Sequence, residues 1–412
     1  MSYFLLLDSY NRQRCALALI DLDNFRYINE VYGYKIGDEL LKTISQELVE
    51  ILKGIGILYR FNGSKFIILF NTLDPEIVKK YIYKVIKRFE RSFKIKDMEF
   101  FIPVNLGVYF SKMCEDIYEI IRKAETAMYE SKKSGKYKCT FYNDSIEDKV
   151  LRKGIISNEI RKSIVNDELK LLYQPIFNLK NKRFEEVEVL LRWKSRKLGE
   201  IPPVEFIPIA EENGFIKDLG YWVIEKACYQ QKIWKDKGIS LKLNINVSPV
   251  QLKDKDFFKR VKEIIIRTGG EYKNIKFEIT ETQILENEIE NVNAMKLLKK
   301  IGIVFLLDDF GAGYSSIKNL VNFPVNEVKI DKYFINNMLK SKKVFDIIRL
   351  FIVVSHKIGY KVIAEGVENK EEIILLVKLG CDKIQGYYIS KPIDEEKILL
   401  FLSNSANYIK IL

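Results

Sequence analysis

Two adjacent carboxylates, Asp308 and Asp309, follow a short apolar run and lead into a glycine-rich loop in the stretch FLLDDFGAGYSS. Residues 303–307 are β-type apolar residues, which predict a buried strand that ends at the two acids. Side chains diverge where a strand ends, so both carboxylates could turn toward one pocket. Their repulsion there would need compensating positive charge, which a pair of divalent cations would supply. An acidic turn after a strand is the alternative interpretation of this pair taken alone.

The same arrangement recurs through the C-terminal half of the chain, where apolar runs carry polar side chains within them or at their C-terminal ends. In chain order these candidate site residues are Gln174, Glu188, Arg192, Asn246, Glu278, Glu281, Asp308, Asp309, Lys329, Asp331, Glu365, Glu368 and Gln385. Any one of them alone could be a structural residue at a strand end. If the runs are neighbouring strands of one barrel, these side chains converge on one site.

Carboxylates dominate this set, and the chain has a single histidine, His356, in an amphipathic helical stretch. Imidazole-rich metal sites and histidine-dependent triads are therefore excluded, whereas hard oxygen ligands favour Mg²⁺ or Mn²⁺. Two such ions about 4 Å apart can activate a water and clamp both oxygens of a phosphodiester. Lys329 can hydrogen-bond that water, and Arg192 offers a planar fork to phosphate. These residues predict metal-assisted phosphodiester hydrolysis.

The elements that must position these residues follow a repeated order of strand and helix from residue 158 onward. The strand-like runs are LKLLYQPIF, FEEVEVLLRW, LKLNINVS, IKFEITE, IVFLLDD, VNEVKID, KVIAEGVE and KIQGYYI. The amphipathic helical stretches are residues 207–236, 257–268, 292–301, 345–358 and 370–379. This α/β pattern predicts a closed (β/α)8 TIM-like barrel, with a doubly wound open sheet as the main alternative.

Residues 1–143 predict a smaller α/β domain ahead of the barrel. Apolar runs at 15–22 and 100–109 predict strands, and residues 75–93 and 117–132 predict helices, as does the spacing of Leu40, Leu41, Ile44 and Leu48. Asn62-Gly63 between the runs 56–59 and 65–70 predicts a hairpin. Residues 144–157 are polar and weakly helical, so we expect a linker there and a second domain at 158–405.

Composition places the chain among ordinary globular proteins, with 412 residues, 47% hydrophobic and 30% charged. The net charge of +12 comes from scattered lysines without a basic-aromatic stripe, so we expect solvated faces and no nucleic-acid partner. No apolar run approaches the roughly 20 residues that span a bilayer, which predicts no membrane insertion and a cytoplasmic location. The five cysteines include no CxxC pair and are expected to be reduced.

Eight ordered motifs make the C-terminal segment, from about residue 169 to 400, resemble an EAL domain, the family of cyclic di-GMP phosphodiesterases. The motifs are YQPI, EVLLRW, NVSPVQL, EITET, DDFGAGYSS, VKID, AEGVE and QGYYISKP. The resemblance implies hydrolysis of cyclic di-GMP to linear pGpG with two divalent ions, Mg²⁺ or Mn²⁺, in a homodimer.

The resemblance also implies roles for the candidate residues. One ion would be held by Glu188, Asn246, Glu278 and Asp308, and the second by Asp308, Asp309 and Glu365. Lys329 would assist the attacking water. Nucleotide contacts and supporting roles would fall to Gln174, Arg192, Gln385, Asp331 and Glu368, while Glu281 would brace the loop 310–316. Val189 replaces the signature alanine and Ala312 a loop threonine; the second change is expected to reduce activity rather than abolish it.

The N-terminal segment resembles a GGDEF domain, the family of diguanylate cyclases, through IDLDNFRYIN, YGYKIGDELL, RFNGSKFIIL and AETAMYESKKSGK. Ser64 and Lys65 stand where that family's signature has acids, and Asp21 alone remains of its metal site. A hydroxyl and a cation cannot hold the Mg²⁺ of a triphosphate reaction, so we expect a cyclase-inactive domain with a regulatory or dimerisation role. Asn29 and Asp38 match the guanine-contacting positions, which leaves GTP binding open. Residues 53–56 lack the Arg-x-x-Asp of product inhibition.

Two other functions compete with an active phosphodiesterase. A catalytically silent receptor would bind cyclic di-GMP and signal through a protein partner, but such a protein should have lost metal-binding acids, and none is missing here. A nonspecific nuclease or nucleic-acid binder is motivated by the basic charge alone. The acid set therefore favours the enzyme.

Overall fold

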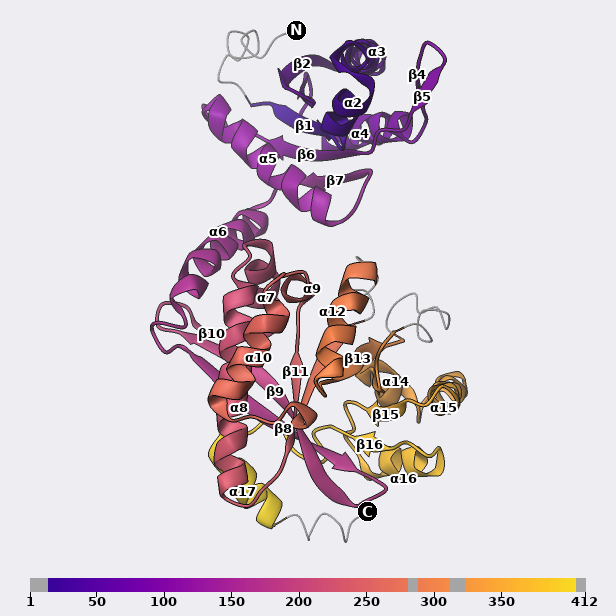
Figure 1. Cartoon of the computed structure of the whole chain (residues 1–412). Helices are drawn as coiled ribbons and strands as arrows, with labels where there is room; N and C mark the ends of the chain where they lie inside the picture. Colours follow the sequence, from indigo (N-terminus) through magenta and orange to yellow (C-terminus); the bar gives the residue numbers. More distant parts are fainter. Residues whose placement is uncertain (1–13, 281–287, 312–322, 405–412) are drawn as a thin grey trace. The chain divides into compact units, whose positions relative to one another are not determined.

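The computed structural model describes residues 14–280, 288–311 and 323–404 (Figure 1). The chain divides into two compact units, residues 1–154 and 155–412. The division falls inside the stretch expected as a linker, and that stretch is a regular helix, α6 (Asp144–Glu159), rather than an irregular connection. None of the described helices combines the length and apolar composition needed to cross a bilayer. All five cysteines are free.

The N-terminal unit is built on a five-stranded sheet in the order β2-β3-β1-β6-β7 (Figure 1). Its strands are β1 (Ala16–Leu22), β2 (Gly56–Asn62), β3 (Lys65–Phe70), β6 (Val104–Phe110) and β7 (Lys138–Phe141). The helices are α2 (Phe25–Tyr32), α3 (Tyr34–Ile51), α4 (Pro75–Phe89) and α5 (Ile117–Lys133). The predicted hairpin is confirmed, because β2 pairs with β3 in antiparallel register up to Asn62 and Lys65.

Helices cover both faces of this sheet and bury two separate apolar cores. Leu40, Leu41 and Ile44 of α3 pack on one face together with α4, as their spacing predicts. On the other face, α5 packs so closely on β6 that a Cβ at Gly107 would lie 2.0 Å from the Ala124 carbonyl oxygen. The predicted helix 75–93 is too long, since α4 ends at Phe89. A short hairpin follows, β4 (Phe93–Ile95) and β5 (Met98–Phe100).

The C-terminal unit is a closed barrel, which confirms the predicted architecture over the open sheet. In the described residues the strand order is β10-β9-β11-β12-β13-β14-β15-β16-β8, and a further pairing of β9 with β8 closes the ring. The strands are β8 (Leu169–Asn178), β9 (Arg183–Ser195), β10 (Gly199–Ile201), β11 (Lys242–Asn246), β12 (Ile275–Thr280), β13 (Val304–Phe310), β14 (Glu327–Ile330), β15 (Lys361–Ala364) and β16 (Lys383–Ile384).

One barrel strand departs from an all-parallel (β/α)8 ring. Strand β8 runs antiparallel to both of its neighbours, β9 and β16. The other neighbouring strands of the ring, in the order β9, β11, β12, β13, β14, β15 and β16, all pair in parallel. The pairing places Gln174 of β8 opposite Glu188 of β9. The reversed strand therefore still brings its polar residue to the expected site.

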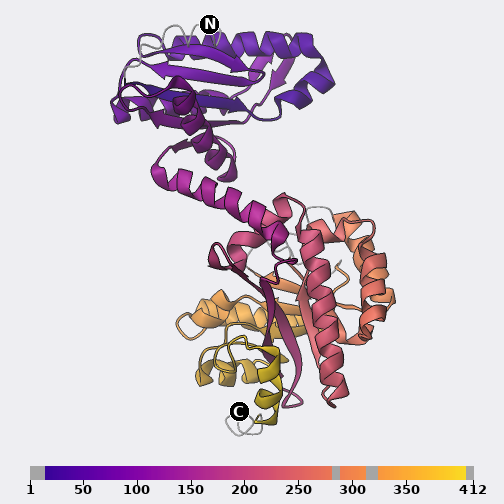
Figure 2. The ribbon, with the colours of Figure 1, turned by 90° about the vertical axis from the view of Figure 1, so that its left-hand side faces the viewer.

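Helices surround the barrel, and α8 lies along the outside of its strands (Figure 2). They are α7 (Pro203–Glu212), α8 (Ile216–Asp236), α9 (Pro249–Leu252), α10 (Phe257–Thr268), α12 (Glu288–Lys300), α14 (Lys332–Asn337), α15 (Lys342–Lys357), α16 (Lys370–Lys378) and α17 (Glu395–Ser403). The predicted stretch 207–236 is two helices, because Asn213 and Gly214 break it, with Gly214 at a φ of 77°. The stretch 257–268 matches α10.

Candidate active site

A bulge in β13 aims the two adjacent acids at one centre. The strand does not end at Asp308, as the sequence predicted, but continues to Phe310 with a shift in its pairing to β14 between Leu307 and Phe310. Asp309 takes a left-handed φ of 53°, and its backbone N–H donates to Asp308 Oδ1 over 3.0 Å. Bulges re-aim side chains in this way beside active sites. The strand therefore ends two residues later than predicted, and both carboxylates still lie at the candidate site.

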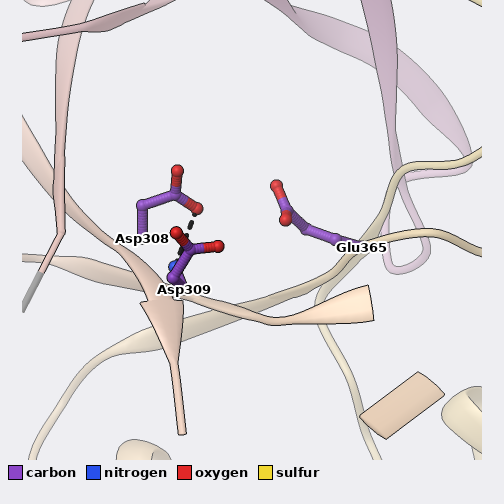
Figure 3. Close-up of side chains that lie close together, drawn as sticks. All are labelled: Asp308, Asp309 and Glu365. Atoms are coloured by element: carbon purple, nitrogen blue, oxygen red, sulfur yellow. Dashed lines mark hydrogen bonds between the residues drawn. The ribbon is translucent and has the colours of Figure 1, made fainter. Parts of the chain in front are cut away.

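Glu365 is the first residue after β15, and its side chain reaches the same centre. Figure 3 shows its carboxylate pointing toward those of Asp308 and Asp309. One oxygen from each of the three residues lies within 4.8 Å of the others. Three carboxylates at this separation repel one another strongly unless cations or protons intervene.

Lys329 supplies a cation at this centre. Its ammonium group lies 2.8 Å from a Glu278 oxygen and 2.5 Å from Glu365 Oε1. Oxygens of Glu188 and Asp308 are each 3.6 Å away. The side chain is only 1% exposed. Four carboxylates from β9, β12, β13 and the end of β15 therefore share one buried lysine.

Amide side chains complete the ring around these acids. Asn246 donates to Glu188 Oε1 over 3.1 Å, and Gln385 donates to the other oxygen of Glu188 over 2.5 Å. Gln385 also donates to Gln174 Oε1, and Gln174 in turn donates to the Ser390 carbonyl oxygen. The arrangement brings Gln174, Glu188, Asn246 and Gln385 into direct contact, as their positions on the strands predicted.

Two cavities open beside the acids and share Asp308. The first, of about 630 Å³, is lined by Arg192, Val204, Ile207 and Asp309 among mostly apolar neighbours. The second, of about 290 Å³, is lined by polar groups that include Gln174, Glu365, Glu368 and Asn336. The guanidinium of Arg192 donates to the Leu191 carbonyl oxygen. Arg192 thus lines the first cavity and Glu368 the second.

Two other predicted residues are placed differently. The Asp331 carboxylate accepts from the Tyr333 backbone N–H over 2.8 Å and caps α14. It is absent from the lining of both cavities, but it lies close enough to Asp309 to help raise the pKa of that carboxyl, after desolvation and Asp308, so it stands near the acidic centre as well as capping α14. Glu281, expected to brace the loop after β13, lies outside the described residues, as does Ala312.

Burial and mutual repulsion raise the pKa values of Glu278, Asp309 and Glu365. Desolvation raises the pKa of Glu365 to about 8, against the lowering effect of Lys329, with Asp308 and Glu188 raising it further. Desolvation also raises the pKa of Glu278 well above its ordinary value. Burial alone would lower the pKa of Lys329, but the surrounding carboxylates, Asp308 first, raise it well above its ordinary value. The raised pKa values of Glu278 and Glu365 therefore favour the protonated form of these two carboxyl groups in the metal-free site.

The raised pKa of Glu365 predicts that the metal-free barrel loses stability as pH rises. A carboxyl group with a folded pKa of about 8 and an ordinary value of 4.5 keeps its proton in the folded state and loses it on unfolding between those values. Its stabilising contribution is therefore complete below about pH 4.5 and is lost as pH rises through about 8. Urea unfolding in EDTA should give a free energy lower by about 2–3 kcal/mol at pH 8.5 than at pH 6. Glu365→Gln should flatten this difference, and an equal fall in both proteins would contradict the assignment.

The donor set fits divalent cations that prefer oxygen. Carboxylate and amide oxygens come from Glu188, Asn246, Glu278, Asp308, Asp309 and Glu365. Glu278 Oε1 is fully buried and has no hydrogen-bond partner among the described residues. A buried carboxylate oxygen without a partner is costly, and coordination to a hard cation would satisfy it.

Four buried charges escaped the sequence interpretation. Glu186, Lys276, Glu327 and Lys383 lie inside the barrel and are each at most 6% exposed. The signal was present, because each stands two residues before a residue singled out as a site candidate, and positions two apart share one face of a strand. They lie toward the N-terminal ends of their runs, where a single charged residue resembles a solvent-facing one.

Fold and site together define a TIM-like α/β barrel with an acidic centre at the C-terminal ends of its parallel strands. The family model described as EAL domain matches residues 157–392, more than half of the chain. The model described as Diguanylate cyclase, GGDEF domain matches residues 5–138. The chain therefore belongs to the EAL domain family and carries a GGDEF domain ahead of the barrel.

Curated relatives share both parts. Signaling protein YkoW of Bacillus subtilis is 34% identical over 393 residues, which is 94% of this chain and 49% of YkoW. Cyclic di-GMP phosphodiesterase PdeR of Escherichia coli is 32% identical over 383 residues, 93% of this chain and 58% of PdeR. This chain thus spans only about half the length of these relatives.

Solved structures resemble the barrel unit. The PaMucR phosphodiesterase in complex with c-di-GMP is 30% identical with a TM-score of 0.56, covering 59% of this chain and 99% of that one. The EAL enzyme Bd1971, with cAMP and cyclic-di-GMP bound, is 31% identical with a TM-score of 0.57, covering 61% and 69%. The barrel is therefore similar to proteins whose structures hold the ligand expected from the sequence motifs.

Proposed function

We propose that the barrel unit hydrolyses cyclic di-GMP to linear pGpG with the help of two divalent cations, Mg²⁺ or Mn²⁺. The observation that carries this proposal is the convergence of the candidate ligands from separate strands on the single ammonium group of Lys329. Relatives named as cyclic di-GMP phosphodiesterases support the choice of substrate.

Glu188, Asn246, Glu278 and Asp308 would hold one cation, and Asp308, Asp309 and Glu365 the other. When bound, such cations lower the pKa of a water molecule and neutralise the phosphodiester charge. Lys329 holds two of the carboxylates in place and can hydrogen-bond an attacking water in the same space. Because the two cavities meet at Asp308, a dinucleotide can place one half in each and its phosphodiester at the acids.

Arg192 and the amide pair set the position of the substrate in this proposal. The Arg192 guanidinium, beside the larger cavity, offers a planar pair of donors to a phosphate. Gln385 and Gln174 keep Glu188 oriented by hydrogen bonds. These residues bind and orient the substrate. The proton of the attacking water leaves toward a neighbouring carboxylate, because the raised pKa of Lys329 keeps its ammonium group protonated and able only to donate.

The experiment that tests the proposal is product analysis with the purified full chain. Incubation with cyclic di-GMP and Mn²⁺ should accumulate pGpG, and EDTA should stop it. Glu188→Ala should abolish turnover with the fold intact by circular dichroism. A matched control is Glu185→Ala, since the Glu185 carboxylate on the same strand accepts from Asn178 and Asn181 instead. Tight binding of cyclic di-GMP without formation of any pGpG would contradict the proposed enzyme activity and favour a catalytically silent receptor.

For the GGDEF unit we propose a regulatory or dimerisation role without cyclase activity. The ammonium group of Lys132 lies 2.5 Å from Asp21, so the one acid left of the expected metal site is already neutralised. Lys65 pairs with Glu125 over 2.6 Å, and Ser64 donates to Asp21 over 3.4 Å. A cavity of about 450 Å³ lined by Asp38 and Arg60 offers room for the base of GTP.

The same product analysis with GTP tests this second proposal. GTP and Mg²⁺ should yield no cyclic di-GMP, because no second acid stands beside Asp21 at the positions of Ser64 and Lys65. A change in pGpG formation on adding GTP would support regulation. Formation of cyclic di-GMP from GTP alone would contradict the assignment.

A further inference from the structure

A closed set of ion pairs lies inside the barrel, formed by Glu186, Lys276, Glu327 and Lys383, here called the ionic layer. Each lysine contacts both glutamates. The Lys276 ammonium group is 2.7 Å from Glu186 and 2.8 Å from Glu327, and that of Lys383 is 2.7 Å from each. The side chains are 2–8% exposed. With all four groups ionised the layer carries no net charge, and both lysines contact the same oxygen of Glu186, Oε1.

The ionic layer lies next to the acidic centre, toward the N-terminal ends of the same strands. Its members on β9, β12 and β14 come two residues before Glu188, Glu278 and Lys329. Lys383 on β16 comes two residues before Gln385. Residues two apart on a strand point to the same side, so each site residue stands directly after a member of the layer.

Stability alone is a poor reason for such a layer. Desolvating four charged groups costs about as much as their attraction returns, and well-packed apolar side chains often give an equal or higher stability. Unlike apolar contacts, ion pairs depend strongly on the relative position of their two groups. A shift of one strand along its neighbours would therefore break contacts of 2.7–2.8 Å. The layer therefore fixes the register of the four strands that carry or lead into site residues.

We propose that Glu186, Lys276, Glu327 and Lys383 are positioning residues, whose closed ion pairs hold β9, β12, β14 and β16 in the register that brings Glu188, Glu278, Lys329 and Gln385 together. The inference rests on the proposed metal site for its functional consequence. It adds a set of residues that touch neither substrate nor cation and act through the strands.

A charge-neutral double variant separates positioning from stability. Lys383→Met with Glu327→Leu removes one cation and one anion and leaves the Lys276–Glu186 pair intact. The melting temperature should stay within about 5 °C of the parent, since paired buried charges can be exchanged for apolar groups at little cost. The dissociation constant for Mn²⁺ alone, measured by titration calorimetry, should rise about tenfold, as for other groups that support metal ligands from behind.

A second readout needs no metal. In the metal-free full chain, amide hydrogen exchange at Glu278 and Lys329 should become about tenfold faster in the double variant, because two of the four strands lose their fixed register. A matched control is Arg267→Met with Glu225→Leu, which removes an exposed ion pair of 2.8 Å on the barrel's helices. The control should leave both readouts unchanged.

Unchanged Mn²⁺ affinity and unchanged exchange in a stable double variant would overturn the proposal. If the double variant does not fold, the same two measurements on Glu186→Asp test the proposal. This substitution keeps the charge but withdraws the carboxylate by one methylene from both lysines. Native affinity and exchange in Glu186→Asp would likewise refute positioning. A parent protein that binds no Mn²⁺ would contradict the proposed function, and the exchange readout would still decide this inference.

Discussion

Asp308→Asn is expected to reduce pGpG formation by at least about a thousandfold while the barrel stays folded. Asp308 is the one carboxylate assigned to both cations, and it lines both cavities. Losing its charge removes several kcal/mol of charge stabilisation at the reacting phosphodiester, and about 4 kcal/mol corresponds to a thousandfold in rate. The loss should appear in kcat as well as in kcat/KM, since the interaction is strongest in the transition state.

The same substitution has a consequence that does not depend on turnover. Asp308 raises the pKa of Glu365 and Asp309 by repulsion. In Asp308→Asn the pKa of Glu365 should therefore fall from its value of about 8, and the pH dependence of metal-free unfolding should shift to lower pH. Asp236→Asn, at the exposed end of α8, is the control for both measurements. Turnover within tenfold of the parent would remove Asp308 from the centre of the site.

The candidate site was largely predictable because its residues interrupt apolar strands. An acid or amide at the end of such a run is conspicuous, and barrel topology brings those ends together. The backbone geometry within β13 was not predictable from the sequence. The bulge at Asp308 and Asp309 looks like a strand end in sequence, since two charged residues break the apolar pattern in the same way. Only the pairing to β14 distinguishes the two.

The direction of β8 was predictable but missed. Its run LKLLYQPIF is separated from FEEVEVLLRW by only NLKNKR. A parallel connection needs about a dozen residues or more, so this short link already required an antiparallel pair. The ionic layer was missed for a different reason. Glu186, Lys276, Glu327 and Lys383 lie in the first half of their apolar runs, where each alone resembles a solvent-facing residue, and only the closed barrel shows them to be mutual partners.

Lys329→Met should separate two roles of the buried lysine. In the described structure its ammonium group neutralises Glu278 and Glu365 at 2.8 and 2.5 Å. Removing one partner from a buried ion-pair set typically costs about 3–5 kcal/mol, here moderated by protonation of the remaining acids. The metal-free variant should therefore unfold at a lower temperature than the parent, and more so at pH 8.5 than at pH 6, where the acids hold their protons.

Mn²⁺ should reverse that loss, because divalent cations replace the charge that the lysine supplied. The melting temperature of the variant should rise more on adding Mn²⁺ than that of the parent, and its Mn²⁺ affinity should be equal or higher. Turnover should nevertheless fall about a hundredfold or more, since the proposed hydrogen-bond donor to the attacking water is gone. Lys361→Met, at an exposed position at the start of β15, is the control. If instead Mn²⁺ affinity falls further than kcat, Lys329 acts mainly by holding the metal-binding carboxylates in place, and the attacking water must be activated by another group.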